Sequence, residues 1–366
     1  QQERPQAKSI ASFRVLTECP LIVILMFQLY PKFMKTNIPV LIKVMMEGLA
    51  LRPPPIQTLT NNLDTAFKKL YLSLVRELVA SQAKTLSFLT YLLRTFTTEL
   101  KAYEDRLATH VVALMSTCPR ESISTRRELL VATRHLLNSD FRSGFYRHVD
   151  NLLDERVLMG SSSRSHDPAL IRPLAYTTLS DFVHHARSMF NMKQLSRVML
   201  LFSRVLHDSS QPLPLTTQYA AVRTLLSLVD LIFQNKDPDG QIGRDMLVRL
   251  LETLTDKLDA LCHYHSVLEN EKDGTAFLAG NRNAPSDTVR EIQSLIRVVI
   301  VGQKTVIVYL STYRKQRADM LAKESVDPPP PPTPTTNDEG ASANHKITNT
   351  EIEIIDRYIQ IAIPAM

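Results

Sequence analysis

Apolar residues recur at every third or fourth position through most of this 366-residue chain, and prolines or polar clusters separate the periodic blocks. This spacing places the apolar side chains on one stripe of an α-helix. Residues 63–100, for example, carry Leu63, Phe67, Leu70 and Leu74 in this pattern. Only 9 residues of the chain are glycine, which argues against folds built on tight hairpin turns or phosphate-binding loops. The sequence therefore predicts an all-α fold.

The lengths and spacing of the blocks indicate a repeated architecture. They predict roughly a dozen helices of about 12 to 25 residues, in pairs that recur about every 40 to 47 residues. That period is typical of HEAT and armadillo-like arrays, in which neighbouring helical pairs bury each other's apolar faces. We expect an α-solenoid of such pairs over residues 1–326. A compact, irregular helical domain is the alternative, because no strict internal repeat is visible.

Local signals predict several helix boundaries. The long block 63–100 predicts two helices that meet near Ser81. Thr125 and Glu128 have the spacing of a capping box, which would start a helix there. Pro173 predicts a kink or a restart within the helix that follows Pro168, because proline lacks the backbone N–H. Residues 141–153 keep helical spacing, and so do 191–207, 214–234, 245–268 and 286–322.

The C-terminal part of the chain differs in composition. Residues 327–346 contain five consecutive prolines followed by small and polar residues, so we expect an exposed proline-rich linker. A proline-rich ligand for an SH3, WW or EVH1-type groove is the alternative interpretation of this segment. Residues 347–366 predict a short helix that returns to the solenoid. Its apolar positions have helical spacing: Ile352, Ile355 and Ile359.

Charge, cysteine content and hydropathy limit the possible environments. Lys and Arg exceed Asp and Glu by 43 to 37, a net charge of +6. Three widely separated cysteines indicate neither a disulfide framework nor a metal-binding pair, which fits a reducing compartment. The most apolar run, residues 21–27, is much shorter than the roughly 20 residues that span a bilayer, and no signal-peptide pattern precedes it. We therefore expect a cytosolic or nuclear protein without membrane contact.

The sequence offers no strong signal for catalysis, a cofactor or a metal. Residues 302–305, GQKT, resemble the end of a phosphate loop, but Arg297 stands where that motif needs its first glycine. His184 and His185 are neighbours, and neighbouring helical positions do not share a face as metal ligands must. The motifs of serine hydrolases, protein kinases and zinc proteases are missing. We therefore expect no enzyme and no small-molecule substrate.

Two clusters of basic residues are candidates for partner binding. In the predicted helix 191–207, Lys193, Arg197 and Arg204 fall within about 40° of one another, opposite the apolar stripe. Leu200 lies near this basic side, which suggests contact on more than one face. The second cluster spans two predicted helices and the turn between them: Arg126, Arg127, Arg134, Arg142 and Arg147. An ordinary solvated surface is the alternative for both clusters.

Five strings of residues resemble one family. Residues 18–30, ECPLIVILMFQLY, are similar to a stretch of the transformation/transcription domain-associated protein (TRRAP) family. Residues 129–142, LLVATRHLLNSDFR, and residues 172–187, RPLAYTTLSDFVHHAR, resemble the same family in the same order. The shorter strings LLSLVD, residues 225–230, and GRDML, residues 243–247, extend the resemblance. It covers roughly residues 13–260 of the chain.

The resemblance implies a function that the pattern of helices does not. Members of this family are very large relatives of the phosphatidylinositol-3-kinase-related kinases, with long HEAT-type arrays, a FAT region and a kinase-like domain that lacks catalytic residues. They are nuclear scaffolds of SAGA-type histone acetyltransferase complexes and receive acidic transcription activators. The resemblance therefore implies a non-catalytic scaffold segment from the array ahead of the FAT region, with protein subunits and acidic activators as partners.

Two other kinds of solenoid remain as alternatives. A nucleic-acid-binding solenoid would fit the basic balance, but the chain lacks the interleaved aromatic and basic residues that favour direct contact with nucleic acid. A karyopherin-like transport solenoid usually has acidic inner surfaces, and the net charge of +6 argues against it.

Overall fold

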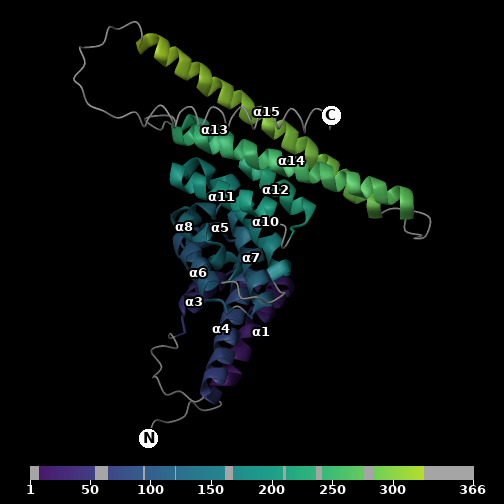
Figure 1. Cartoon of the computed structure of the whole chain (residues 1–366). Helices are drawn as coiled ribbons and strands as arrows, with labels where there is room; N and C mark the ends of the chain where they lie inside the picture. The colour runs from purple at the N-terminus through teal and green to yellow at the C-terminus, as the bar shows by residue number, and fades with distance from the viewer. Residues whose placement is uncertain are drawn as a thin grey trace. The chain divides into compact units, whose positions relative to one another are not determined.

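The structure, a computed structural model, describes residues 8–53, 65–93, 95–119, 121–160, 168–208, 212–235, 241–275 and 284–324 (Figure 1). All regular elements in these ranges are α- or 3₁₀-helices, which confirms the predicted all-α fold. The chain divides into two compact units, Gln1–Ala186 and Arg187–Met366. The predicted loop at 161–166, the linker at 327–346 and the returning helix at 347–366 lie outside the described residues.

The main helices of the first unit form two rows. Each helix of the first row contacts the next in chain order: α1 (Lys8–Leu29), α4 (Thr65–Leu92), α7 (Ile123–Leu137) and α10 (Pro168–Ala186). The second row is built in the same way from α3 (Ile38–Ala50), α6 (Glu104–Thr117) and the 3₁₀-helix η2 (Arg142–His148). Short helices connect the rows: α2 (Pro31–Met34), α5 (Thr97–Lys101), α8 (Val149–Leu152) and α9 (Glu155–Met159). Two contacting rows are the arrangement that an α-solenoid predicts.

The second unit ends in the two longest helices that the structure describes, α14 and α15. It contains η3 (Arg187–Met189), α11 (Met192–His207), α12 (Leu215–Leu226), α13 (Val229–Gln234), α14 (Gln241–Thr275) and α15 (Ala284–Glu324). The last two helices lie side by side, and α11 and α12 contact them (Figure 1). Gly302 of α15 allows α12 to approach closely, because a Cβ atom there would lie 2.5 Å from Leu226 Cδ2. This glycine packs a helix and is not part of a phosphate loop.

Side-chain hydrogen bonds between neighbouring helices recur at the spacing of one repeat. Lys101 donates to the carbonyl of Asp140, 39 residues further on. Arg134 donates to Asp181 across 47 residues, and His207 bonds the carbonyl of Thr253 across 46. These separations agree with the repeat of about 40 to 47 residues that the helix spacing predicts. Each bond ties one helical layer to the next.

Two predicted boundaries are wrong. The break predicted near Ser81 does not occur, since α4 runs through it from Thr65 to Leu92. The Ser81 hydroxyl donates to the Leu78 carbonyl inside the helix, so it does not compete for a cap. The predicted capping box also fails, because α7 begins at Ile123 and Thr125 lies buried in its first turn.

Two further segments differ from the expected helices. Pro173 lies inside α10, near its N-terminus, where the missing N–H removes one backbone bond. The helix does not restart after Pro173, and the predicted kink stays a prediction. Residues 142–148 form a 3₁₀-helix and not an α-helix. The physical reason is close packing on α6: a Cβ atom at Gly144 would lie 2.9 Å from the Glu104 carbonyl, and the Glu104 carboxylate accepts hydrogen bonds from Ser143 and Gly144.

Candidate interaction surfaces

The first predicted basic cluster lies together on one helix. α11 begins as predicted, with a capping box in which Asn191 and Gln194 exchange side-chain and backbone hydrogen bonds. Its apolar stripe is buried: Leu195, Val198, Met199, Leu201, Phe202, Val205 and Leu206. Lys193 and Arg204 are exposed, and Arg197 is half-buried. Leu200 is 69% exposed, so an apolar side chain lies on the same helix as these cations.

The second cluster does not form a continuous basic surface. Arg127 is exposed on α7. Arg134 pairs with Asp181 at 2.6 Å, and Arg147 pairs with Asp105 at 3.1 Å. Arg142 on η2 is half-buried. Two of these charges are therefore offset by neighbouring carboxylates, which weakens the field that the cluster presents to an acidic partner.

Arg126 has a structural role in place of the predicted surface role. Its side chain is only 2% exposed, because its guanidinium reaches the C-terminal ends of two helices. Nη2 donates to the Cys118 carbonyl at 2.7 Å, just after α6. Nη1 donates to the carbonyls of Met115, Val157 and Leu158, at 3.2, 2.9 and 3.2 Å. A cation at helix C-termini offsets the helix dipoles, although burial lowers the pKa of Arg126. We therefore exclude Arg126 from the candidate partner-binding residues.

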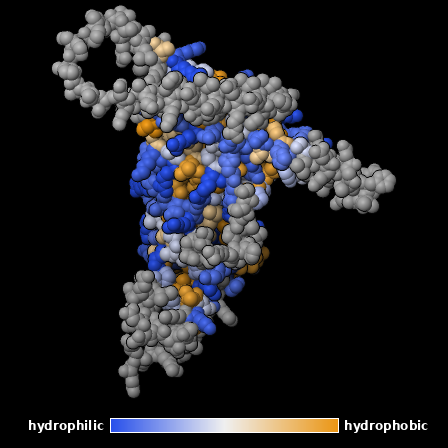
Figure 2. All heavy atoms as spheres, viewed as in Figure 1, coloured by the Kyte–Doolittle hydropathy of each residue, from blue (hydrophilic) through white to orange (hydrophobic). Residues whose placement is uncertain are grey.

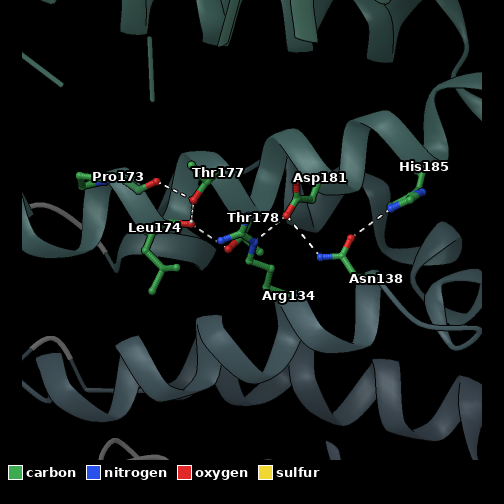
Figure 3. A network of polar contacts seen from close by, with 8 residues as sticks. All are labelled: Arg134, Asn138, Pro173, Leu174, Thr177, Thr178, Asp181 and His185. Atoms are coloured by element: carbon green, nitrogen blue, oxygen red, sulfur yellow. Dashed lines mark hydrogen bonds and ion pairs between the residues drawn. The ribbon is translucent and has the colours of Figure 1, made fainter. Parts of the chain in front are cut away.

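The polar network between α7 and α10 shows how the second cluster is held (Figure 3). Asp181 accepts hydrogen bonds from Arg134 and from the Asn138 amide, at 2.6 and 3.4 Å. Asn138 Oδ1 in turn lies 3.2 Å from His185 Nε2. Burial lowers the pKa of His185, and the charges of Arg142 and His184 lower it further. The network joins two repeats by side chains from both helices.

An exposed apolar face on α1, α2 and α3 was not predicted. Phe33 is 77% exposed, and other large apolar side chains within residues 21–51 are also exposed: Leu21, Ile22, Leu25, Met26, Leu29, Tyr30, Val40, Val44 and Leu51. Residues 20–31 contain no charged residue, and their apolar side chains surround α1 instead of forming one stripe. This composition could have predicted a partner surface here, because a helix with apolar side chains on all sides is normally buried on all sides. In Figure 2, orange apolar residues interrupt the mainly blue surface of the face in view.

Some titratable and nucleophilic side chains are buried in the part of the chain that the structure describes. No group of three His, Cys, Asp or Glu side chains there is close enough to hold a metal ion. Burial raises the pKa of the Cys118 thiol, which opposes thiolate formation. Lys257 is buried on α14, donates to the Leu206 carbonyl at 3.1 Å, and has a pKa that burial lowers to about 8. The Lys257 ammonium group lies at the C-terminal end of α11, where a positive charge offsets the helix dipole.

One described helix has the length and composition of a membrane span. It covers Asp287–Gln316 within α15, and 33% of its most apolar window is buried. We considered only uninterrupted apolar runs in the sequence and therefore expected no stretch long enough to span a membrane. Polar residues interrupt the apolar residues of α15, so that criterion missed this helix. A core helix that is apolar on more than one side has the same composition.

Comparison with known proteins identifies the family of this fold. The sequence profile of the Tra1 HEAT repeat central region matches residues 74–278, more than half of the chain. The probable transcription-associated protein 1 of Dictyostelium discoideum is 38% identical over 254 residues, which are 69% of this chain and 5% of that protein.

Two further relatives match a similar part of the chain. The SAGA complex/NuA4 acetyltransferase complex subunit Tra1 of Schizosaccharomyces pombe is 35% identical over 263 residues, 69% of this chain and 7% of that protein. The human transformation/transcription domain-associated protein is 34% identical over 253 residues, 69% of this chain and 6% of that protein. The chain thus spans less than a tenth of the length of these relatives. The resemblance found in its short strings is confirmed: the chain belongs to the Tra1/TRRAP family, with the HEAT repeat central region at residues 74–278.

Proposed function

We propose that this chain is a non-catalytic scaffold segment of a nuclear transcription coactivator subunit that assembles with histone acetyltransferase complexes. The observation that carries the proposal is a helical array of this family whose layers are tied at the spacing of one repeat. Such an array offers an extended surface with many independent contact points. The Schizosaccharomyces pombe relative is named as a subunit of the SAGA and NuA4 acetyltransferase complexes, which supports the choice of complex.

The basic residues of α11 are the proposed contact for acidic activators. Lys193 and Arg204 are exposed, Arg197 is half-buried, and all three share a side of the helix with the exposed Leu200. Acidic activation segments combine carboxylates with scattered apolar residues, and an apolar side chain among cations complements both features. Opposite charge steers the encounter, while burial of Leu200 adds contact area.

The exposed apolar face of α1, α2 and α3 is the proposed contact for further helices of the assembly. An apolar patch of this kind marks a protein–protein interface in soluble proteins. The layers of a solenoid bury their apolar faces only against neighbouring helices, and Val40 and Val44 are exposed one turn apart on α3. We therefore expect an apolar partner surface at this end and an acidic one at α11.

Affinity purification of the tagged full-length protein from nuclear extract tests the scaffold function. Near-stoichiometric recovery of acetyltransferase and adaptor subunits at moderate salt is the expected result. Recovery of transport factors or RNA without any acetyltransferase would contradict the proposal. Subunits lost selectively from a variant with Leu25→Ser and Leu29→Ser would map to the apolar face.

Charge reversal tests the activator contact on α11. The triple variant Lys193→Glu, Arg197→Glu and Arg204→Glu is expected to weaken binding of an acidic activation peptide at least tenfold and to flatten its salt dependence. The matched control reverses Lys32, Lys35 and Lys43, three exposed lysines that give the same change in net charge. Equal losses in both variants would show that net charge alone matters and would remove the assignment to α11.

A further inference from the structure

α15 has apolar side chains on two opposite faces. Leu295, Val299 and Val306 face the core of the second unit and are buried. On the other side, Val301 is 62% exposed and Val308 is 57% exposed. Within the part of the chain that the structure describes, the main contacts of α15 are with α12 and α14, and Val301 and Val308 stay exposed beside them.

The side chains of this second face share one stripe of the helix. Val301, Thr305, Val308 and Thr312 are spaced by four, three and four residues, which places them within about 60° of one another. The first three are exposed and Thr312 is half-buried. We call these four residues the α15 stripe. Alternating spacings of three and four are those of a helix-packing seam, and β-branched side chains fill such seams well. Exposed basic residues run along one edge of the stripe: Arg297, Lys304 and Lys315.

The chain itself contains a segment that complements the α15 stripe. Residues 351–363 read EIEIIDRYIQIAI. On a helix of 100° per residue, Ile352, Ile355, Ile359 and Ile363 fall within about 80° of one another. Three of the first six residues of the segment are acidic, whereas the edge of the stripe is basic. The segment therefore matches the stripe in apolar spacing and opposes it in charge.

We propose that residues 351–363 form an amphipathic helix that packs on the α15 stripe and covers it. The length of the chain permits this return. Val308 lies 16 residues before the end of α15, which corresponds to about 24 Å along the helix. The 26 residues at 325–350 span up to about 80 Å when extended, so they reach back over this distance easily. In this arrangement the proline-rich linker at 327–346 connects α15 to the returning helix. Without that helix, the apolar side chains of the stripe would remain exposed to solvent.

Hydrogen exchange of the intact chain tests the contact. We expect the amides of residues 351–363 to be protected in the unmodified protein. The double variant Val301→Asp and Val308→Asp, which puts carboxylates opposite the acidic segment, should lower that protection at least tenfold. The amides of α15 itself are read in the same experiment and should keep their protection, because both valines face away from the core. The matched control is Val131→Asp and Met189→Asp, two exposed apolar residues outside the proposed contact surfaces.

A charge exchange provides a second, independent test. Lys304→Glu should reduce the protection of residues 351–363, and Glu353→Lys in the same chain should restore part of it. Unprotected amides in the unmodified protein, or protection that neither α15 change affects, would overturn the proposal. Cross-linking of a mixture of isotopically light and heavy chains identifies the source of the helix. Mixed cross-links between the stripe and residues 351–363 would also overturn it, because they would show a second copy on the stripe.

Discussion

Arg134 Nε lies 2.6 Å from Asp181 Oδ2, and this ion pair joins α7 to α10, the next helix in its row (Figure 3). The two residues are 47 positions apart, so the pair measures one repeat of the array. Both side chains are partly exposed, and water screens such pairs. The ion pair therefore fixes how the two helices are aligned but contributes little to the free energy of unfolding.

A double-mutant cycle on Arg134→Ala and Asp181→Ala should give a coupling energy of about 0.5–1 kcal/mol. Chemical unfolding at low and high salt measures it, and the coupling should fall as salt rises. The comparison pair is Arg76 and Glu121, which is longer at 3.4 Å and more exposed, and its coupling should be close to zero. A coupling above about 2 kcal/mol for Arg134 would contradict a screened surface pair.

Arg126→Met should destabilise the first unit by about 2–4 kcal/mol, since it leaves four backbone carbonyls without a donor. Hydrogen exchange should show the loss first at the C-terminal ends of α6 and α9. The adjacent Arg127→Met is a close control, because Arg127 is exposed and should change stability by less than about 0.5 kcal/mol. Similar effects from both substitutions would refute the structural role of Arg126.

Gly160→Ala should destabilise the same region for two reasons. The backbone φ angle at Gly160 is +81°, which a residue with a side chain rarely adopts. A Cβ atom there would also lie 3.3 Å from Arg126 Cζ. We expect a loss of about 1–2 kcal/mol, measured by thermal unfolding. Combined with Arg126→Met, the loss should be smaller than the sum, because the methionine removes the crowded guanidinium.

Lys257 should make the second unit more stable at high pH. Burial lowers its folded-state pKa from 10.5 to about 8, so between these values the folded protein binds fewer protons than the unfolded chain. The free energy of unfolding therefore rises from pH 8 to pH 10.5, by at most about 3 kcal/mol from this group. The difference between the unmodified protein and Lys257→Met isolates that contribution. A difference that stays constant over this pH range would show that the lysine is solvated.

Gln303→Leu is expected to leave stability unchanged or to raise it by about 1 kcal/mol. The side chain is fully buried, and its Nε2 donates to Thr255 Oγ1 at 3.0 Å, whereas its Oε1 has no hydrogen-bond partner. Thr255 keeps its own hydrogen bond to the Leu251 carbonyl after the change. Thermal unfolding decides the sign, and a clear loss would mean that the buried amide is satisfied by water.

Apolar periodicity was sufficient to predict part of the fold. α11 starts after Asn191 and buries the predicted stripe, because apolar spacing is a local signal. A helix break was predicted near Ser81 and a kink or restart at Pro173, yet α4 continues through Ser81 and α10 does not restart after Pro173. Packing on neighbouring layers outweighs a weak local preference at each position.

The sequence by itself determined the helical class, the repeat of about 40 to 47 residues and, through its short strings, the family. Only the tertiary structure decided which charges face solvent. Arg126 and Arg127 are adjacent and chemically identical, but one binds the ends of α6 and α9 and the other is exposed. The tertiary structure also decided which apolar residues are buried: Phe27 of α1 and Val299 of α15 are buried, whereas Leu25 and Val301 on the same helices are exposed. Helical periodicity predicts which residues share a face of a helix, whereas the burial of that face depends on helices from other parts of the chain that pack against it.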